Sequence, residues 1–313
     1  IGAKLLALQL PIGEGLDFKG ISSVIDNSDY IYEGGKGKKQ NSSNGTIAEY
    51  KDKLIEFAAE SSEELMEKYF DGKELTADEI THGLKETRAA NNVAPPLVVS
   101  SGKNIAIDLL IDFIVKYLPS PLEAKPVKTK DGKEVKYDSS QPFSAQIFKT
   151  IADPYVGKLS LFKVITGKLS GTAELVNTTQ DKKEKVNHIY TMAGKKQIDL
   201  DEIAAGDIGA FAKLTDSVTG DTLSDAKQKA QYAQIEFPQP VISMAVSPKS
   251  KGDEDKLGTG LVRLKEEDPT ISIERNAETK QTLINGIGEV HIDVVSSKLK
   301  TKFGVDVVLS DPI

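Results

Sequence analysis

Residues 284–303 read Ile284-Asn-Gly-Ile-Gly-Glu-Val-His-Ile-Asp-Val-Val-Ser-Ser-Lys-Leu-Lys-Thr-Lys-Phe303, and this stretch decides the fold of the C-terminal part of the chain. Its two glycines mark a tight turn. Beyond the turn, Ile292, Val295 and Leu299 recur at spacings of three and four residues, so one face is apolar. The pattern predicts a helix over 289–303 that begins directly after a turn.

Strands and a second amphipathic helix are predicted around this helix. Apolar runs at 281–284 and 305–309 predict a strand on either side of it. Upstream, the pattern predicts strands at 241–246 and 271–274 and an amphipathic helix over 252–268 between them. The resulting order β-α-β-β-α-β is that of a ferredoxin-like sandwich.

The segment 142–225 reads as all-β. Leu159, Leu161 and Lys163 alternate with Ser160, Phe162 and Val164, and glycines punctuate the short strands at regular intervals. This spacing predicts a small closed barrel. A polar, lysine-rich linker with a turn at Asp131-Gly132 precedes it.

The N-terminal part alternates strands and helices, which suggests part of an α/β domain. Thr76-Ala-Asp-Glu79 is a capping box and predicts the start of a helix. In a helix expected over 104–118, Asp108, Asp112 and Lys116 share one polar face, and the rest faces a core. The other expected elements are a buried strand over 4–10 ending at Pro11, an exposed loop over 34–45, a long helix over 48–69 and a short buried strand over 97–100.

These patterns predict a multidomain α+β protein with three parts. Residues 1–121 would form a partial α/β subdomain, residues 122–235 a β-barrel, and residues 236–313 the ferredoxin-like βαββαβ sandwich. The chain begins at Ile1 rather than methionine, and strand-like runs stand at both ends. We therefore expect a piece of a longer protein.

The composition narrows the classes of site. No cysteine occurs among the 313 residues, so disulfides and thiolate metal sites are excluded. His82, His188 and His291 are too far apart in sequence to suggest a metal site. The net charge of −7 argues against broad electrostatic binding of nucleic acid. No apolar run approaches the roughly 18 to 20 residues of a membrane helix, and we expect a cytoplasmic protein.

Two short motifs of the N-terminal part are Leu8-Gln-Leu-Pro-Ile-Gly13 and Tyr117-Leu-Pro-Ser-Pro121. The first resembles the segment after the guanine-specificity motif of the elongation factor G family of translational GTPases, and the second resembles the junction into the second domain of that family. The other matching segments are Phe18–Gly20, Glu63–Tyr69, Glu74–Thr76, Pro142–Ala145, Asp153–Gly157, Ala205–Asp207, Thr219–Leu223, Phe237–Val241, Glu267–Pro269 and Gly286–Asp293.

The resemblance implies a five-domain parent, of which this chain holds the end of the GTPase domain with its insert, domain II and domain III. The parent would bind GTP and Mg²⁺ and promote tRNA-mRNA translocation as a monomer on the ribosome. Its partners would be rRNA, ribosomal proteins and, through the insert between Gly13 and Tyr69, the stalk protein. A ribosomal protection or recycling GTPase shares this architecture and stays an alternative, as does a non-catalytic ribosome-binding module.

The motifs of GTP hydrolysis are missing from the sequence. No Gly-Lys pair is followed by Ser or Thr, so there is no phosphate loop of the form GxxxxGK[ST]. Gly34-Gly-Lys-Gly-Lys38 is expected to be a solvated loop, and no Asn-Lys-x-Asp occurs. We therefore predict no catalytic residue, no bound cofactor and no GTPase activity for this chain alone.

Ser100, Ser101 and Gly102 are the first candidate site. The resemblance places them in the Ser-Ala loop whose backbone meets the guanine oxygen, with Gly102 in place of the usual alanine. The other interpretation is a plain strand-to-helix turn with Asn104 as the N-cap. Both interpretations stay open.

Two further groups of residues are candidates. By resemblance, Gly286, Gly288, Glu289 and His291 form a corner that faces the switch regions and the ribosome. The sequence shows no partner for His291 as a base, so we favour a packing histidine beside a tight glycine turn. A lysine cluster around two predicted loops is a candidate rRNA patch, although such clusters are usually a solvated edge; its members are Lys182, Lys183, Lys185, Lys195 and Lys196.

Overall fold

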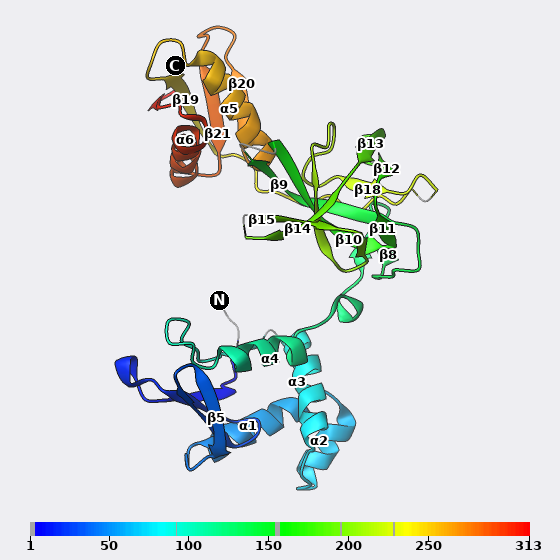
Figure 1. Ribbon diagram of the computed structural model, residues 1–313, viewed down its shortest axis with the longest axis vertical. Helices are drawn as coiled ribbons and strands as arrows, with labels where there is room; N and C mark the ends of the chain where they lie inside the picture. Colours follow the sequence, from blue (N-terminus) through cyan, green and yellow to red (C-terminus); the bar gives the residue numbers. More distant parts are fainter. Residues whose placement is uncertain (1–3, 92, 154–156, 195, 228) are drawn as a thin grey trace. The chain divides into compact units, whose positions relative to one another are not determined.

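The computed structural model of the chain describes residues 4–91, 93–153, 157–194, 196–227 and 229–313. Backbone contacts divide the chain into an N-terminal unit, Ile1–Ser120, and a C-terminal unit, Pro121–Ile313. Figure 1 draws the first in blue to teal and the second in green to red. The second unit holds both folds predicted for the C-terminal part, and the boundary between residues 235 and 236 stays a prediction.

The N-terminal unit combines a short parallel strand pair, a separate antiparallel sheet and several helices. Strand β1 pairs in parallel with β6, and the antiparallel sheet has the order β2-β3-β4-β5. Leu8, Leu54 and Leu84 are buried together in one core. The elements are β1 (Lys4–Leu5), β2 (Gln9–Ile12), η1 (Gly15–Asp17), β3 (Gly20–Ser23), β4 (Ser28–Glu33), β5 (Lys36–Asn41), α1 (Ile47–Ala59), α2 (Glu63–Phe70), α3 (Ala77–Asn91), β6 (Val93–Ala94) and α4 (Ile107–Tyr117).

The antiparallel sheet corrects two of the predictions. The strand expected over 4–10 is two short strands, and Pro11 lies inside β2 instead of ending it. Strand β2 is at the edge of the sheet, where a residue without an N–H is tolerated. The loop expected over 34–45 contains β5, whose residues are all exposed, so it carries no apolar alternation to reveal it.

Two other elements of this unit differ from expectation. The long helix expected over 48–69 is two helices, because Ser62 caps α2 by accepting the N–H of Leu65 at 3.3 Å. The strand expected over 97–100 is reduced to a single bridge between Ser100 and Ile105.

Helix α4 starts later and is less covered than predicted. Ala106 is its N-cap at φ 59°, and Asn104, at φ 53°, lies before the cap, so the N-cap role expected for Asn104 is wrong. Ile111 and Val115 are 55% and 78% exposed. The described residues therefore leave part of the apolar side of α4 uncovered, contrary to the prediction that it faces a core.

A curled eight-stranded sheet forms the first part of the C-terminal unit (Figure 1). Its order is β13-β12-β18-β9-β10-β17-β14-β15, and Phe162 stacks on Phe211 in its core with ring centroids 3.9 Å apart. Within the described ranges no ladder joins the end strands β13 and β15, so the sheet is a half-barrel and not the closed barrel that was predicted. The strands are β9 (Ser144–Asp153), β10 (Gly157–Thr166), β12 (Ala173–Asn177), β13 (Lys182–Val186), β14 (Ile189–Ala193), β15 (Lys196–Leu200), β17 (Ile208–Ala212) and β18 (Thr222–Ser224), accompanied by η2 (Pro121–Glu123) and the pairs β7 (Val127–Lys128) with β8 (Glu134–Val135) and β11 (Lys168–Ser170) with β16 (Glu202–Ala204).

The second part of this unit confirms the predicted β-α-β-β-α-β order. The antiparallel sheet has the order β20-β21-β19-β22, which is that of a ferredoxin-like sandwich. Leu261, Leu264, Ile284 and Leu299 are buried between the sheet and its two helices. The elements are β19 (Ile242–Pro248), α5 (Glu254–Glu267), β20 (Ser272–Arg275), β21 (Thr282–Gly286), α6 (Glu289–Phe303) and β22 (Val307–Ser310).

Candidate functional sites

The loop expected to meet guanine is a tight turn before α4. Ser100 and Ile105 exchange backbone hydrogen bonds of 3.0 and 2.9 Å, and Ser101 and Gly102 are exposed between them. The ammonium of Lys103 donates to the carbonyl of Leu16. An open depression of about 510 Å³ lies beside this lysine.

The absence of a GTP and Mg²⁺ site from this chain stays a prediction. A guanine nucleotide needs a cradle of backbone amides and a lysine for its phosphates, with a hydroxyl and a carboxylate for the metal. The turn offers Lys103, but this cation is already bound to a carbonyl. In the described part of the chain no three His, Asp or Glu side chains are grouped so as to hold a metal ion. We derive no step of hydrolysis from this loop.

The corner around His291 is held by a hydrogen-bonded pair that the sequence did not reveal. The N–H of Ile287 donates to His291 Nδ1 at 3.1 Å. A ring nitrogen that accepts carries no proton, so the proton of the neutral ring is on Nε2 and points to Asp268 Oδ2, 3.0 Å away. The expectation that His291 lacks a partner is therefore wrong, because Asp268 approaches from the end of α5.

This arrangement fixes the turn between β21 and α6. Burial alone would raise the pKa of Asp268, but hydrogen bonds from Thr270 and His291 outweigh it and hold the pKa below its usual value. A Cβ at Gly286 would lie 2.9 Å from His291 Nδ1, so the close approach requires glycine. Gly288 is the N-cap of α6, and Glu289 is exposed in its first turn.

An apolar row is exposed beside the same corner. Ile287, Val290 and Val294 are 44%, 77% and 45% exposed; Val290 and Val294 are four residues apart on one side of α6, and Ile287 lies in the turn before it. The corner thus combines a rigid glycine turn with an accessible apolar surface.

The lysine cluster is spread over strands and not over loops as predicted. Lys182, Lys183 and Lys185 lie in β13 and Lys196 lies in β15, which are the two end strands of the half-barrel. Lys195 lies outside the described residues. The two groups therefore do not belong to neighbouring strands of the ladder.

Two of these lysines already have acidic partners. Lys182 pairs with Asp216, and Lys183 pairs with Glu174 at 2.7 Å. These pairs reduce the positive charge of β13, which weakens the case for an rRNA patch there. The patch stays a prediction.

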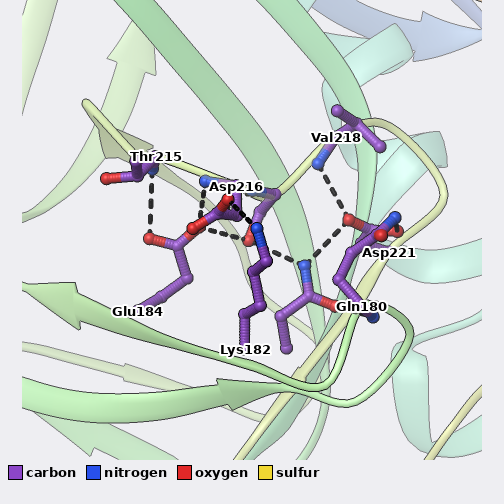
Figure 2. A network of polar contacts seen from close by, with 9 residues as sticks. Gln180, Lys182, Glu184, Thr215, Asp216, Val218 and Asp221 are labelled. Carbon is purple, nitrogen blue, oxygen red and sulfur yellow. Dashed lines mark hydrogen bonds and ion pairs between the residues drawn. The ribbon is translucent and has the colours of Figure 1, made fainter.

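A buried carboxylate on β13 organises the loop opposite, and Figure 2 shows it facing Thr215 and Asp216. Glu184, 3% exposed, accepts the N–H groups of Thr215, Asp216 and Ser217 at 2.9 to 3.1 Å. It also accepts the Ser217 hydroxyl at 2.7 Å. Several donors on one carboxylate balance the cost of burying its charge.

The same network continues through an amide. Asn177 Nδ2 donates to Ser217 Oγ at 2.9 Å and to Asp221 Oδ2 at 2.8 Å. Asp221 also accepts the N–H of Val218 at 2.9 Å (Figure 2). None of the motifs singled out in the sequence pointed to this network. A signal was present in Lys182-Lys-Glu-Lys-Val186, because Val186 faces the core and strand alternation places Glu184 on the same side.

Glu267 joins the two folds of the C-terminal unit. This last residue of α5 is 8% exposed at its side chain, and its Oε1 lies 2.5 Å from the ammonium of Lys302 on α6. The N–H of Ala152 on β9 donates to the same oxygen at 3.1 Å. A single carboxylate thus contacts α6 and the half-barrel together.

The two halves of the C-terminal unit each match a family model. Elongation factor G domain 2 matches residues 142–226, which carry the Glu184 network, and Elongation Factor G, domain III matches residues 237–311, which carry the His291 corner. The chain belongs to the elongation factor G family. Its half-barrel is therefore a domain II and its βαββαβ sandwich a domain III of that family.

A solved structure extends the likeness to the N-terminal unit. A protein from Thermus thermophilus is 26% identical to this elongation factor G family chain and superposes with a TM-score of 0.80. The match covers 99% of this chain and 45% of the Thermus protein, so the chain spans less than half the length of that relative. In the ranges that the structure describes, no helix is both long and apolar enough to cross a membrane.

Proposed function

We propose that this chain is a ribosome-docking part of an elongation factor G-like GTPase that promotes translocation of tRNA and mRNA in the cytoplasm. The observation that carries the proposal is the succession of a domain II half-barrel and a domain III sandwich within one compact unit. The likeness of the whole chain to the Thermus protein supports an N-terminal unit of the same origin.

GTP and Mg²⁺ would be bound by the parent protein mainly outside this chain. The sequence contains no GxxxxGK[ST] segment, and Lys103 beside the Ser100–Gly102 turn is engaged with a carbonyl. The chain alone is therefore expected neither to bind GTP tightly nor to hydrolyse it. The turn would add only a backbone contact to the guanine of a nucleotide held by the parent.

The surface proposed to face the ribosome and the switch regions is the corner of domain III. Its glycine turn is fixed by His291 and Asp268, and its exposed row of Ile287, Val290 and Val294 offers apolar area for a partner. The insert of the N-terminal unit would contact the stalk protein through α1 and α2, with the parent acting as a monomer.

Co-sedimentation of the purified 313-residue chain with ribosomes tests this proposal. We expect the chain to pellet with ribosomes, and Val290→Glu to reduce the pelleted fraction because it places a charge in the apolar row. The matched control is Val262→Glu on α5, since Val262 is also exposed, at 58%. Absence of the chain from the ribosomal pellet, or equal loss in both variants, would contradict the assigned surface.

A phosphate-release assay on the same mixtures tests the nucleotide part separately. Release with GTP and ribosomes is expected to equal that of ribosomes alone. Release above this level would show that the chain contains a hydrolytic site of its own. The proposal that GTP is bound mainly outside this chain would then be wrong.

A further inference from the structure

The outer face of the domain II half-barrel carries a depression of about 320 Å³, a size typical of small-molecule sites. Its floor and rim come from β9, β10 and β17. Val127 and Tyr137, from the segment that precedes β9, complete the lining of the depression. Neither the domain II match nor the proposed ribosomal role assigns anything to this place.

Strand register brings three of the lining side chains into one row. Lys163 of β10 pairs with Gln146 of β9 and with Ile208 of β17. Directly paired residues of antiparallel strands point to the same face. Phe162, the next residue along β10, is buried in the core, so the row with Lys163 faces outward.

Aromatic and aliphatic side chains surround this row. Phe148 stands next to the point where the β9–β10 register shifts and is 38% exposed. The ring of Tyr137 lies 5.1 Å from the ammonium of Lys163. Ile165 is buried at the floor, and Ile208 is exposed at the rim. A planar ring that enters the depression would find apolar surface and two aromatic side chains to contact.

Two polar side chains of the depression, Lys163 and Gln146, can still bind groups of a ligand. Among the described residues that line it, none is Asp or Glu, so the ammonium of Lys163 meets no anion there. Gln146 Nε2 donates to the carbonyls of Ala233 at 2.8 Å and Gly220 at 3.3 Å, which leaves its Oε1 as an acceptor. The site thus offers one cation and one acceptor beside aromatic walls.

We propose that this depression binds a single nucleotide, either free or as an unpaired unit of single-stranded RNA. The base lies against Phe148 and Tyr137, the phosphate meets Lys163, and an amino or hydroxyl group of the nucleotide donates to Gln146 Oε1. Stacking of a base on aromatic side chains is the usual means by which proteins hold unpaired nucleotides. The proposal goes beyond the proposed ribosomal role and does not depend on it, because a free nucleotide suffices.

An NMR titration of the ¹⁵N-labelled chain tests the proposal, with adenosine monophosphate, adenosine and a trinucleotide RNA as probes. We expect the monophosphate to shift the amides of Gln146, Phe148 and Lys163. Adenosine should bind about tenfold more weakly, because a charge-assisted contact to Lys163 is lost. Binding of both nucleotide probes supports a site for the free nucleotide, and binding of the trinucleotide alone supports RNA as the source.

Variants separate this site from non-specific binding. Lys163→Gln and Phe148→Ala should each weaken binding about tenfold. Lys168→Gln on β11, a change at an exposed lysine outside the depression, should leave binding unchanged. The proposal is overturned if neither the monophosphate nor the trinucleotide shifts these amides, if the shifts are centred elsewhere, or if the unsubstituted chain and Lys163→Gln bind equally. Native-like spectra of the free variants confirm that they are folded.

Discussion

The carboxylate of Glu267 at the end of α5 lies 2.5 Å from the ammonium of Lys302 on α6. The side chain of Glu267 is only 8% exposed. The same oxygen accepts the N–H of Ala152 from the half-barrel at 3.1 Å. Lys298 lies 3.6 Å from the other oxygen. Domains II and III of this chain are therefore joined through one buried acidic group.

Removal of this group should destabilise the C-terminal unit strongly. Glu267→Ala removes the anion that faces two partly exposed lysines and leaves the N–H of Ala152 without its acceptor, which should cost about 2 kcal/mol. We expect a lower urea midpoint of unfolding for this variant. Glu266→Ala, which removes the neighbouring, more exposed partner of Arg263, should cost less than about 1 kcal/mol. Equal midpoints for the two variants would contradict the role of Glu267.

The Glu184 carboxylate should control the order of the loop that it holds. Glu184→Gln replaces an acceptor oxygen by a donor amide opposite backbone N–H groups, which should cost about 2 kcal/mol of unfolding free energy. Hydrogen exchange should become faster at the amides of Thr215, Asp216 and Ser217. Glu174→Gln changes an exposed glutamate on the adjacent strand and serves as the control. Unchanged exchange at the three amides in Glu184→Gln would show that the carboxylate does not hold the loop.

The capping box at the start of α3 should give the N-terminal unit a defined acid dependence. Lys68 and the N–H of Thr76 bind the Glu79 carboxylate and lower its pKa from 4.5 to about 2. A lowered folded-state pKa stabilises the fold above pH 4.5, and this contribution is lost as the pH falls towards 2. Glu79→Gln should therefore be less stable than the unsubstituted chain at neutral pH, and the difference in stability should vanish near pH 2.

Urea unfolding of both proteins across this pH range checks the prediction. Glu64→Gln, at an exposed glutamate of α2, should not reproduce the pH-dependent difference. If the unfolding free energies of the unsubstituted chain and of Glu79→Gln differ by the same amount at every pH, ionisation of Glu79 contributes nothing to stability.

Local sequence patterns were sufficient to predict the elements whose apolar residues recur at a regular spacing and form one buried face. Helix α6 has the predicted bounds, because Ile292, Val295 and Leu299 share one buried stripe and a glycine stands on either side of the helix. The capping box of Thr76 and Glu79 was also readable, since both of its hydrogen bonds span three residues.

Elements that depend on distant partners could not be predicted in this way. Strand β5 has no buried residue and is defined only by its pairing with β4. The partner of His291 is Asp268, and strands β20 and β21 lie between these two residues in the sequence. Glu184 binds a loop about thirty residues further along the chain. Neither contact leaves a local periodicity, so the sequence pointed to His291 but not to its role.

The tautomer of His291 follows from its two contacts and can be observed directly. Nδ1 accepts from Ile287 and Nε2 faces Asp268, so ¹⁵N chemical shifts of the neutral ring should show a protonated Nε2 and an unprotonated Nδ1. Asp268→Ala should speed exchange of the Nε2 proton with water while the Ile287 contact remains. His188, exposed beside Asp199, provides an internal comparison. A protonated Nδ1 in the neutral ring would contradict the geometry of the corner.

The most direct test of the central claim is competition in a translocation assay. Ribosomes carrying tRNA and mRNA are driven by an intact elongation factor G and GTP, and the rate of movement of the mRNA is measured as this chain is added. If the chain occupies the site of a translocation factor without hydrolysing GTP, the rate should fall as its concentration rises, and Val290→Glu should restore it. An unchanged rate at concentrations where the chain pellets with ribosomes would contradict the claim and favour a different ribosomal function.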